Sequence, residues 1–147
     1  MRRLRSVWRR DDGAALIEAA FVLPLLLFVS IAIIEFGRAF QTWQVVTNAA
    51  REGARVAVLS GMSDDAVKTR VKEYMKMGID TPGAAEITIN RTTTVSLGGT
   101  QTASASRVQV DYPFTFIVLQ PVAQLLVKGS TVGEALTMRS AAIMRNE

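Results

Sequence analysis

A single carboxylate stands at the start of the most apolar segment of the chain, and its position suggests a specific chemistry. Glu18 lies four residues after Ala14 and directly before sixteen uncharged residues, 19–34. A carboxylate inside a membrane helix costs about 2.5–3.5 kcal/mol at the bilayer centre and less near an end. Cutting the Gly13–Ala14 bond would create an amine one helical turn from Glu18. When protonated, that amine would offset the desolvation of the carboxylate.

Most other site chemistry is excluded by composition. The chain has no cysteine and no histidine, which removes disulfides, thiolate or imidazole metal sites, and Ser-His or Cys-His nucleophiles. No acidic cluster has the spacing of a carboxylate metal site. The pair Gly98-Gly99 is predicted to form a turn, because no strand–glycine–helix order with a lysine surrounds it. We therefore expect no catalytic residue, metal, cofactor or small-molecule substrate.

The N-terminal third of the chain has the charge and hydropathy pattern of a membrane anchor. Residues 1–13 carry five arginines and two aspartates, so most of the net charge of +4 lies there. Residues 14–34 would span roughly 30 Å as a helix, which matches a bilayer core. A basic flank keeps that end in the cytoplasm. A nucleic-acid-binding arm is the alternative for the arginines, but no basic patch with interleaved aromatic residues follows.

Three interpretations of residues 1–34 are available. A cleaved signal peptide has a shorter apolar stretch, and no small-residue cleavage site follows Ile34. An uncleaved anchor fits the length and charge, with Glu18 reaching to the interface. A prepilin-type leader ends in glycine, here Gly13, and is cut before an apolar segment that is retained. This third interpretation explains Glu18 best, because processing creates its partner, but the second remains open.

The rest of the chain predicts an α+β head on this anchor. Apolar residues recur at helical spacing as far as Leu59, which predicts one helix of some 45 residues with a kink at Pro24. Ser63 is a good N-cap for a short second helix that closes at Gly78. Alternation over 87–91, 108–112 and 135–144 predicts antiparallel strands. A polar, turn-rich connection is expected at 96–104, and an irregular or briefly helical crossover at 119–128.

Packing of these elements defines three parts. The water-side half of the long helix and one face of the sheet each need an apolar partner, so we expect them to cover each other. Pro113 suggests a sheet edge or a bulge, and Trp43 is expected in the core. The predicted parts are a basic leader (1–13), a transmembrane helix (14–35) and an extracytoplasmic head (36–147).

Four motifs resemble the TadE-like family of the tight-adherence (Tad/Flp) pilus and secretion system. They are Gly13-Ala14-Ala15-Leu16-Ile17-Glu18, Leu23-Pro24-Leu25-Leu26-Leu27, Ile34-Glu35-Phe36-Gly37-Arg38 and Thr47-Asn48-Ala49-Ala50-Arg51-Glu52-Gly53-Ala54-Arg55. Residues 136–142 are similar to the family's closing strand. The family usually has an aromatic residue directly after the leader glutamate, whereas Ala19 stands here.

The resemblance implies a pilin-like, non-catalytic minor pseudopilin that takes part in assembling or initiating an adhesive pilus. Its implied partners are a prepilin peptidase, other pilins or pseudopilins, and inner-membrane assembly proteins. The implied location is the inner membrane, crossed once, or the pilus itself. The alternative from the residues alone is an uncleaved, membrane-anchored binding module.

Five further residues are candidates for packing or assembly contacts. Gly37 and Gly53 would each destabilise a helix by about 1 kcal/mol relative to alanine, which close packing would justify. Arg51 and Arg55 lie one turn apart and could contact a neighbouring subunit together with Glu52. The alternative is a solvated helix face with a local Glu52–Arg55 pair. Glu35 with Arg38 is interpreted as the membrane–water boundary.

Overall fold

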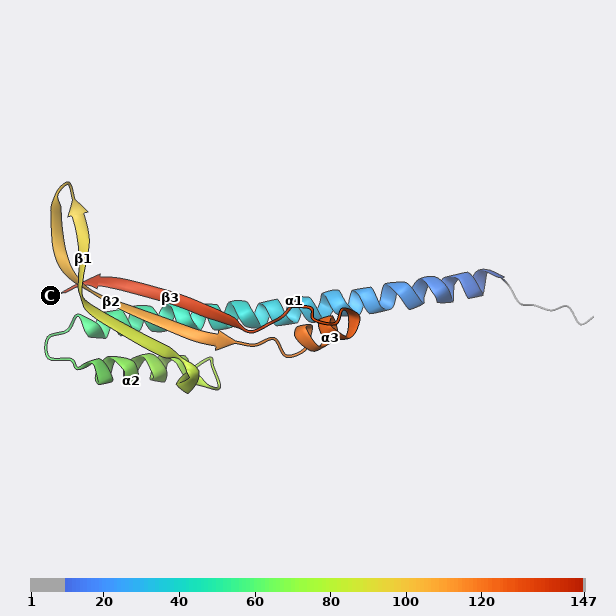
Figure 1. Cartoon of the computed structure of the whole chain (residues 1–147), viewed down its shortest axis with the longest axis horizontal. Coiled ribbons are helices and arrows are strands. Elements are labelled where there is room, and N and C mark those ends of the chain that lie inside the picture. The colour runs from blue at the N-terminus through green and yellow to red at the C-terminus, as the bar shows by residue number, and fades with distance from the viewer. Residues whose placement is uncertain (1–9, 147) are drawn as a thin grey trace, which may run out of the picture.

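The protein consists of one long helix with a small α+β head packed against its C-terminal half (Figure 1). The computed structural model describes residues 10–146. Helix α1 runs from Arg10 to Ala57, 48 residues, and the predicted α+β class is confirmed. Of the predicted leader, residues 1–9 lie outside the described residues.

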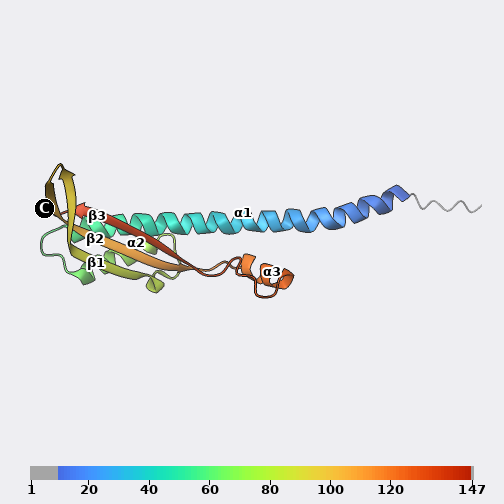
Figure 2. The same cartoon turned by 45° about the horizontal axis from the view of Figure 1, so that its top comes forward.

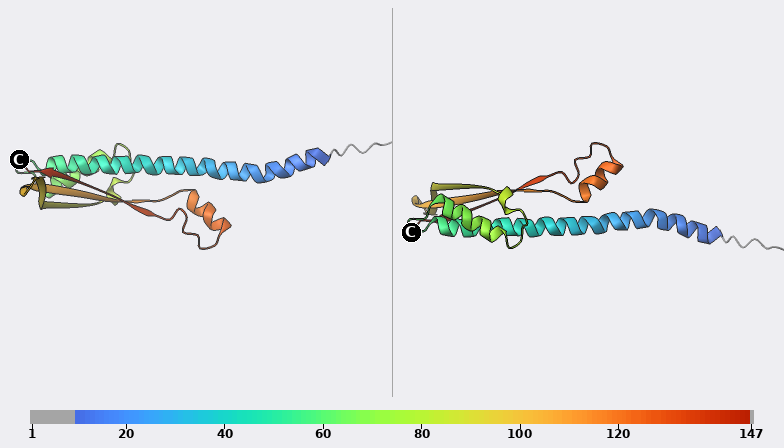
Figure 3. Two further views of the ribbon diagram at one scale, coloured as in Figure 1. Left: turned by 90° about the horizontal axis from the view of Figure 1, so that it is seen from above. Right: turned by 90° about the horizontal axis from the view of Figure 1, so that it is seen from below.

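Helix α1 continues through Pro24 without ending. Proline removes one internal hydrogen bond, and such residues bend helices. Figure 3 shows a gentle bend in the N-terminal part of α1, consistent with the kink predicted at Pro24. Six residues further on, the Ser30 hydroxyl donates to the Leu26 carbonyl at 2.8 Å. Ser30 has the only side-chain hydroxyl in the uncharged run 19–34, and this hydrogen bond satisfies it within the helix.

Helix α2 (Asp64–Met75) is capped at its N-terminus as the sequence predicts, whereas its C-cap is Lys76, two residues before the predicted end at Gly78. The Ala66 amide donates to the Ser63 hydroxyl at 3.2 Å, and Asp64 and Asp65 occupy the first turn. Val67, Val71 and Met75 form its buried face. Figure 1 shows α2 beside the C-terminal half of α1. A short loop joins the two helices, and α2 runs back along α1. A single 3-10 turn, Pro82–Ala84, then leads into the sheet.

The sheet has three antiparallel strands in the order β1-β2-β3. They are β1 (Glu86–Gly98), β2 (Gln101–Phe114) and β3 (Leu136–Arg145). The last strand and the brief crossover helix, α3 (Leu119–Leu126), agree with the predictions. β1 begins opposite Asp111, so Pro113 beyond it has a strand neighbour only in β3, consistent with the edge expected there.

The polar connection predicted at 96–104 is wrong in extent, because nearly all of it is strand. Gly98 pairs with Gln101, which leaves a two-residue turn with Gly99 at φ 59°. Figure 1 shows this hairpin tip bending away from the helices at the end of the molecule where α1 ends. Neither face of this hairpin tip is covered by another element of the described chain, so most of its residues are small and polar. The alternation of apolar and polar residues that identifies a half-buried strand is therefore absent.

The main core lies between α1, α2 and the sheet. Its α1 positions are mostly small, and its buried members are Val46, Ala49, Ala50, Ala54, Ala57, Val67, Val71, Met75, Ile79, Ala85, Val108, Val110 and Tyr112. The expected mutual cover of helix and sheet is therefore present. Trp43 does not join it: 47% of its surface is exposed, so that prediction is wrong. The alanines bring α1 close to its neighbours, and that face has no room for an indole.

Replacement by alanine is expected to have opposite effects at the two α1 glycines considered as packing candidates, Gly37 and Gly53. A Cβ on Gly53 would lie 2.5 Å from Val71 Cγ2 and 3.1 Å from Val108 Cγ1, whereas one on Gly37 would meet nothing within 4 Å. Overpacking typically costs about 1–3 kcal/mol, and a free helical Gly→Ala change gains about 1 kcal/mol. We expect Gly53→Ala to destabilise and Gly37→Ala to stabilise the full chain. Denaturant unfolding in detergent measures both, and equal midpoints would contradict the packing.

Candidate functional site

The candidate processing site lies at the exposed start of α1. Gly13 and Ala14 are both in its first turns and exposed, and Glu18 is exposed one turn further along. Residues four apart on a helix share a face, so Ala14 and Glu18 are neighbours as the spacing predicts. A Cβ on Gly13 would touch nothing within 4 Å. Packing within the described chain therefore does not require glycine there.

The predicted assembly residues near the end of α1 divide between two faces. Gly53 lies against α2 and β2. Glu52 also faces α2, where it accepts hydrogen bonds from Arg70 Nε at 3.0 Å and Nη2 at 2.8 Å. Arg55 approaches Glu52 only to 4.0 Å and Arg51 donates to Asn48 Oδ1, so both arginines remain on the exposed face. Glu52 and Gly53 thus hold the head together, and the two arginines remain available to another molecule.

Glu35 forms the principal polar contact between α1 and the connection from β2 to β3. Only 4% of its surface is exposed. It accepts hydrogen bonds from the Ile117 amide at 3.1 Å and the Val118 amide at 3.3 Å, and it pairs with Arg38 at 3.1 Å. Arg38 also donates to the Thr115 carbonyl at 2.6 Å, and its guanidinium lies 4.4 Å from the centre of the Phe114 ring. One carboxylate therefore anchors backbone that is 82 residues away in the sequence.

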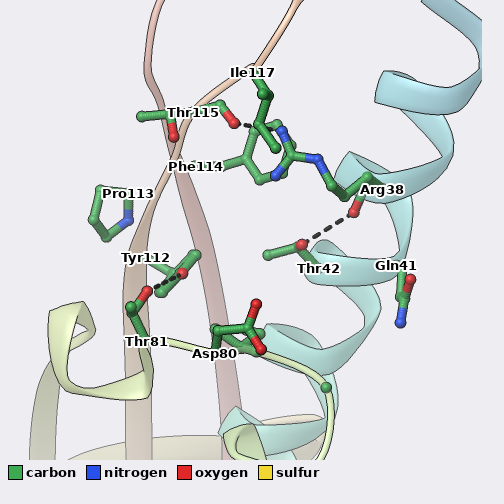
Figure 4. Close-up of a pocket in the computed structure, with 12 residues that line it drawn as sticks. Arg38, Gln41, Thr42, Asp80, Thr81, Tyr112, Pro113, Phe114, Thr115 and Ile117 are labelled. Carbon is green, nitrogen blue, oxygen red and sulfur yellow. Dashed lines mark hydrogen bonds between the residues drawn. The ribbon is translucent and has the colours of Figure 1, made fainter. Parts of the chain in front are cut away.

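A cavity of about 330 Å³ is lined in part by Arg38, Thr115 and Ile117. Figure 4 shows its lining residues. It lies between α1, the loop after α2 and the end of β2, and Arg38 crosses one side of it over Phe114. On the opposite side Thr81 and Tyr112 share a hydrogen bond of 2.9 Å. Within residues 10–146 no group of three or more acidic residues could hold a metal ion. The cavity offers hydrogen-bonding side chains, the carboxylate of Asp80 and an aromatic wall.

A second carboxylate, Asp111, joins the strands of the sheet. Its hydrogen bond from Arg139 Nε, 2.8 Å long, lowers its pKa, and the Gln109 amide contributes, while burial acts in the opposite direction. Because the folded-state pKa is lowered, the contribution to stability is complete above the ordinary carboxyl pKa. It is lost as the pH falls through the lowered value. This is a cross-strand contact that supports the head in neutral solution.

The anchoring role of Glu35 was not predicted. Sequence reasoning placed Glu35 and Arg38 at a membrane boundary, since they end the uncharged run. The contact with Ile117 and Val118 depends on how β2 runs back along α1, which no local pattern encodes. The available signal was a second uncharged run, residues 112–127, which begins in the last residues of β2 and continues through α3.

One family model matches part of the chain. The model described as TadE-like protein matches residues 13–55. The chain carries a TadE-like segment. The match confirms the resemblance seen in the sequence over these residues. It begins at Gly13, ends at Arg55 and contains every candidate residue named above on α1. No curated protein and no solved structure matches the chain.

The matched segment is also the part that can cross a membrane. Among the described residues, α1 is the one helix long and apolar enough to span a bilayer, by length and composition. Its most apolar stretch is not buried against the head. TadE-like sequence and membrane-spanning character thus coincide in one helix.

Proposed function

We propose that the protein is a non-catalytic minor pseudopilin that takes part in assembling or initiating a Tad/Flp-type adhesive pilus. The observation that carries the proposal is the TadE-like match over residues 13–55. It is supported by the order Gly13, Ala14, Glu18 at the exposed start of an uncovered apolar helix. In this proposal a prepilin peptidase cuts after Gly13, and Ala14 becomes the mature N-terminus.

The structure suggests how such a subunit would work. Residues 14–35 anchor the chain in the inner membrane with the arginine-rich end in the cytoplasm. The head is held on α1 by a packed core and by Glu52. Movement of the helix during assembly would therefore carry the head with it. The new amine of Ala14 would pair with Glu18 of the same or a neighbouring subunit, and other pilins and inner-membrane assembly proteins would contact the exposed helix.

Two features argue for a structural role over catalysis. The chain lacks histidine and cysteine, the commonest general base and the most nucleophilic side chain. The carboxylates Glu35 and Asp111 are each engaged by an arginine in a structural contact. These groups position backbone and strands within the head.

The test is the mature N-terminus of the protein purified from membranes. In cells with a prepilin peptidase we expect a chain that begins at Ala14, lighter by the thirteen-residue leader. In cells without the peptidase, and for Gly13→Leu in either cell, we expect the full chain. Intact-mass measurement distinguishes the species. A wild-type chain that keeps Met1 in the presence of an active peptidase would overturn the processing step.

The alternative is an uncleaved anchor whose head binds a ligand outside the membrane. The observation that favours it is the cavity of about 330 Å³ beside Arg38. In that case Met1 would be retained, and loss of the protein would leave pili normal. Pilus counts in a deletion strain therefore separate the two functions.

A further inference from the structure

The connection between β2 and β3 extends past the sheet along the N-terminal half of α1. We call residues 115–135 the arm; it contains α3 (Leu119–Leu126). Figures 1 and 2 show α3 beyond the end of the sheet, at the level of the middle of α1, and both views in Figure 3 show α3 set off to one side of α1. The arm thus lies at the level of a part of α1 that extends beyond the sheet.

The arm lies at the level of the apolar part of α1. Phe28 packs against a buried cluster of Phe114, Phe116 and Leu119 at the base of the arm. Phe28 precedes Glu35 by seven residues, which is about 10 Å along a helix. If Glu35 marks the outer membrane boundary, α3 lies beside α1 on the membrane side of it.

The arm has the surface of a lipid-facing segment. Residues 112–127 contain no charge, and the first charge after them is Lys128. Several large apolar side chains of the arm point outward: Ile117 is 66% exposed, Leu125 85% and Val127 64%. Soluble surfaces rarely gather such residues into one patch without a partner. In contrast, Leu119 and Ala123 face inward.

The space between α3 and α1 is also apolar. A cavity of about 420 Å³ is lined by apolar residues alone: Pro24, Leu25, Leu27, Phe28, Ile31 and Val122. Pro24, Leu25, Leu27, Phe28 and Ile31 belong to the predicted transmembrane helix. A groove without hydrogen-bonding side chains that is continuous with a membrane span fits a hydrocarbon chain.

We propose that the arm inserts into the extracytoplasmic leaflet of the membrane, with lipid covering its apolar face and filling the groove against α1. This inference rests on the membrane anchoring proposed above. Interfacial helices bury their apolar face about 5–10 Å into the headgroup and acyl boundary. Lys128 follows the uncharged run, and its long stem can carry the ammonium back to the headgroups. The Glu35 contact holds the arm at this depth.

The absence of cysteine makes a direct test available. Single variants Leu125→Cys and Val127→Cys would be labelled with an environment-sensitive dye in the full chain, reconstituted in phosphatidylethanolamine–phosphatidylglycerol vesicles. Leu27→Cys serves as the membrane reference. Met77→Cys is the matched head control, since Met77 is equally apolar in type and 74% exposed. Emission would be quenched by spin-labelled lipids and, separately, by aqueous iodide.

We expect the two arm positions to follow Leu27→Cys: blue-shifted emission, several-fold stronger lipid quenching than Met77→Cys, and protection from iodide. Iodide quenching of both arm positions equal to Met77→Cys would overturn the inference. Protection from iodide without lipid quenching would also overturn it, since a second copy of the chain would then cover the arm. If Leu27→Cys itself escapes lipid quenching, the anchoring fails, and with it the proposed function.

Discussion

Replacing Glu35 by alanine is expected to release the arm from α1 while the rest of the head stays folded. The change removes the acceptor for the Ile117 and Val118 amides and leaves Arg38 without its carboxylate. Breaking one partner of a buried pair costs about 3–5 kcal/mol. The low end, about 3 kcal/mol, applies because the Arg38 side chain is 36% exposed and water can reach it.

The measurement is amide hydrogen exchange of the full chain in detergent micelles. A local loss of about 3 kcal/mol corresponds to roughly a hundredfold faster exchange at Ile117 and Val118. Protection of Val108 and Val110, in the main core, should remain unchanged, because that core does not include Glu35. Glu35→Gln retains an oxygen acceptor and loses only the charge, so it should fall between wild type and alanine.

Glu73→Ala is the matched control. Glu73 is also three residues from an arginine on a helix, but its side chain is 56% exposed and lies 3.9 Å from Arg70. Exposed pairs of this kind contribute about 0–1 kcal/mol, so little change is expected. If Glu35→Ala exchanges no faster than Glu73→Ala at Ile117 and Val118, the Glu35 contact does not hold the arm.

The elements predicted correctly are those with a strong local signal. The uncharged run 19–34 and the continued helical spacing after it defined α1, although the helix already begins at Arg10. Ser63 with two following aspartates defined the start of α2, and its hydroxyl caps the helix as expected. Strict alternation defined the inner halves of β1 and β2, where one face is buried against α1. In each case the residue types reflect an environment within a few residues.

The parts that failed depend on distant neighbours. Residues 96–104 are strand only because each half of the hairpin pairs with the other beyond the end of α1. Trp43 was expected in the core on hydrophobicity, but the core side of α1 consists mainly of alanines that bring the elements together. Glu35 could be identified as a boundary charge, yet its partners at 117 and 118 follow from the path of β2. Periodicity indicates which face of a helix or strand is apolar, but it does not indicate which other element packs against that face.

The second large effect is expected when Glu18 is replaced. Such variants should still insert into the membrane but should fail to assemble. Glu18→Leu removes a carboxylate from an exposed position on the first turns of α1. Insertion then becomes easier by up to about 3 kcal/mol, and by less if Glu18 lies near the membrane surface. The amount of protein in the membrane should therefore hold or rise. Within residues 10–146 no cation is paired with Glu18, so no contact there is lost within the subunit.

Assembly should nevertheless fail, because the new amine of Ala14 would lose its partner in a medium of low dielectric constant. An unpaired buried charge costs several kcal/mol, and the register between neighbouring helices would no longer be fixed by the pair. Glu18→Gln should behave like Glu18→Leu, since it also lacks the charge. Glu18→Asp retains the charge with a shorter reach and should restore part of the assembly.

The experiment measures membrane abundance and pilus number side by side for the three variants and wild type, together with the mature mass. A mature mass that differs from that of wild type only by the substituted side chain shows that processing is intact, so a loss of pili reports the missing charge itself. Normal pili in both Glu18→Leu and Glu18→Gln would contradict the pairing. Glu18 would then be a boundary residue that reaches to the interface, and the carboxylate at the start of the apolar run would need no partner from processing.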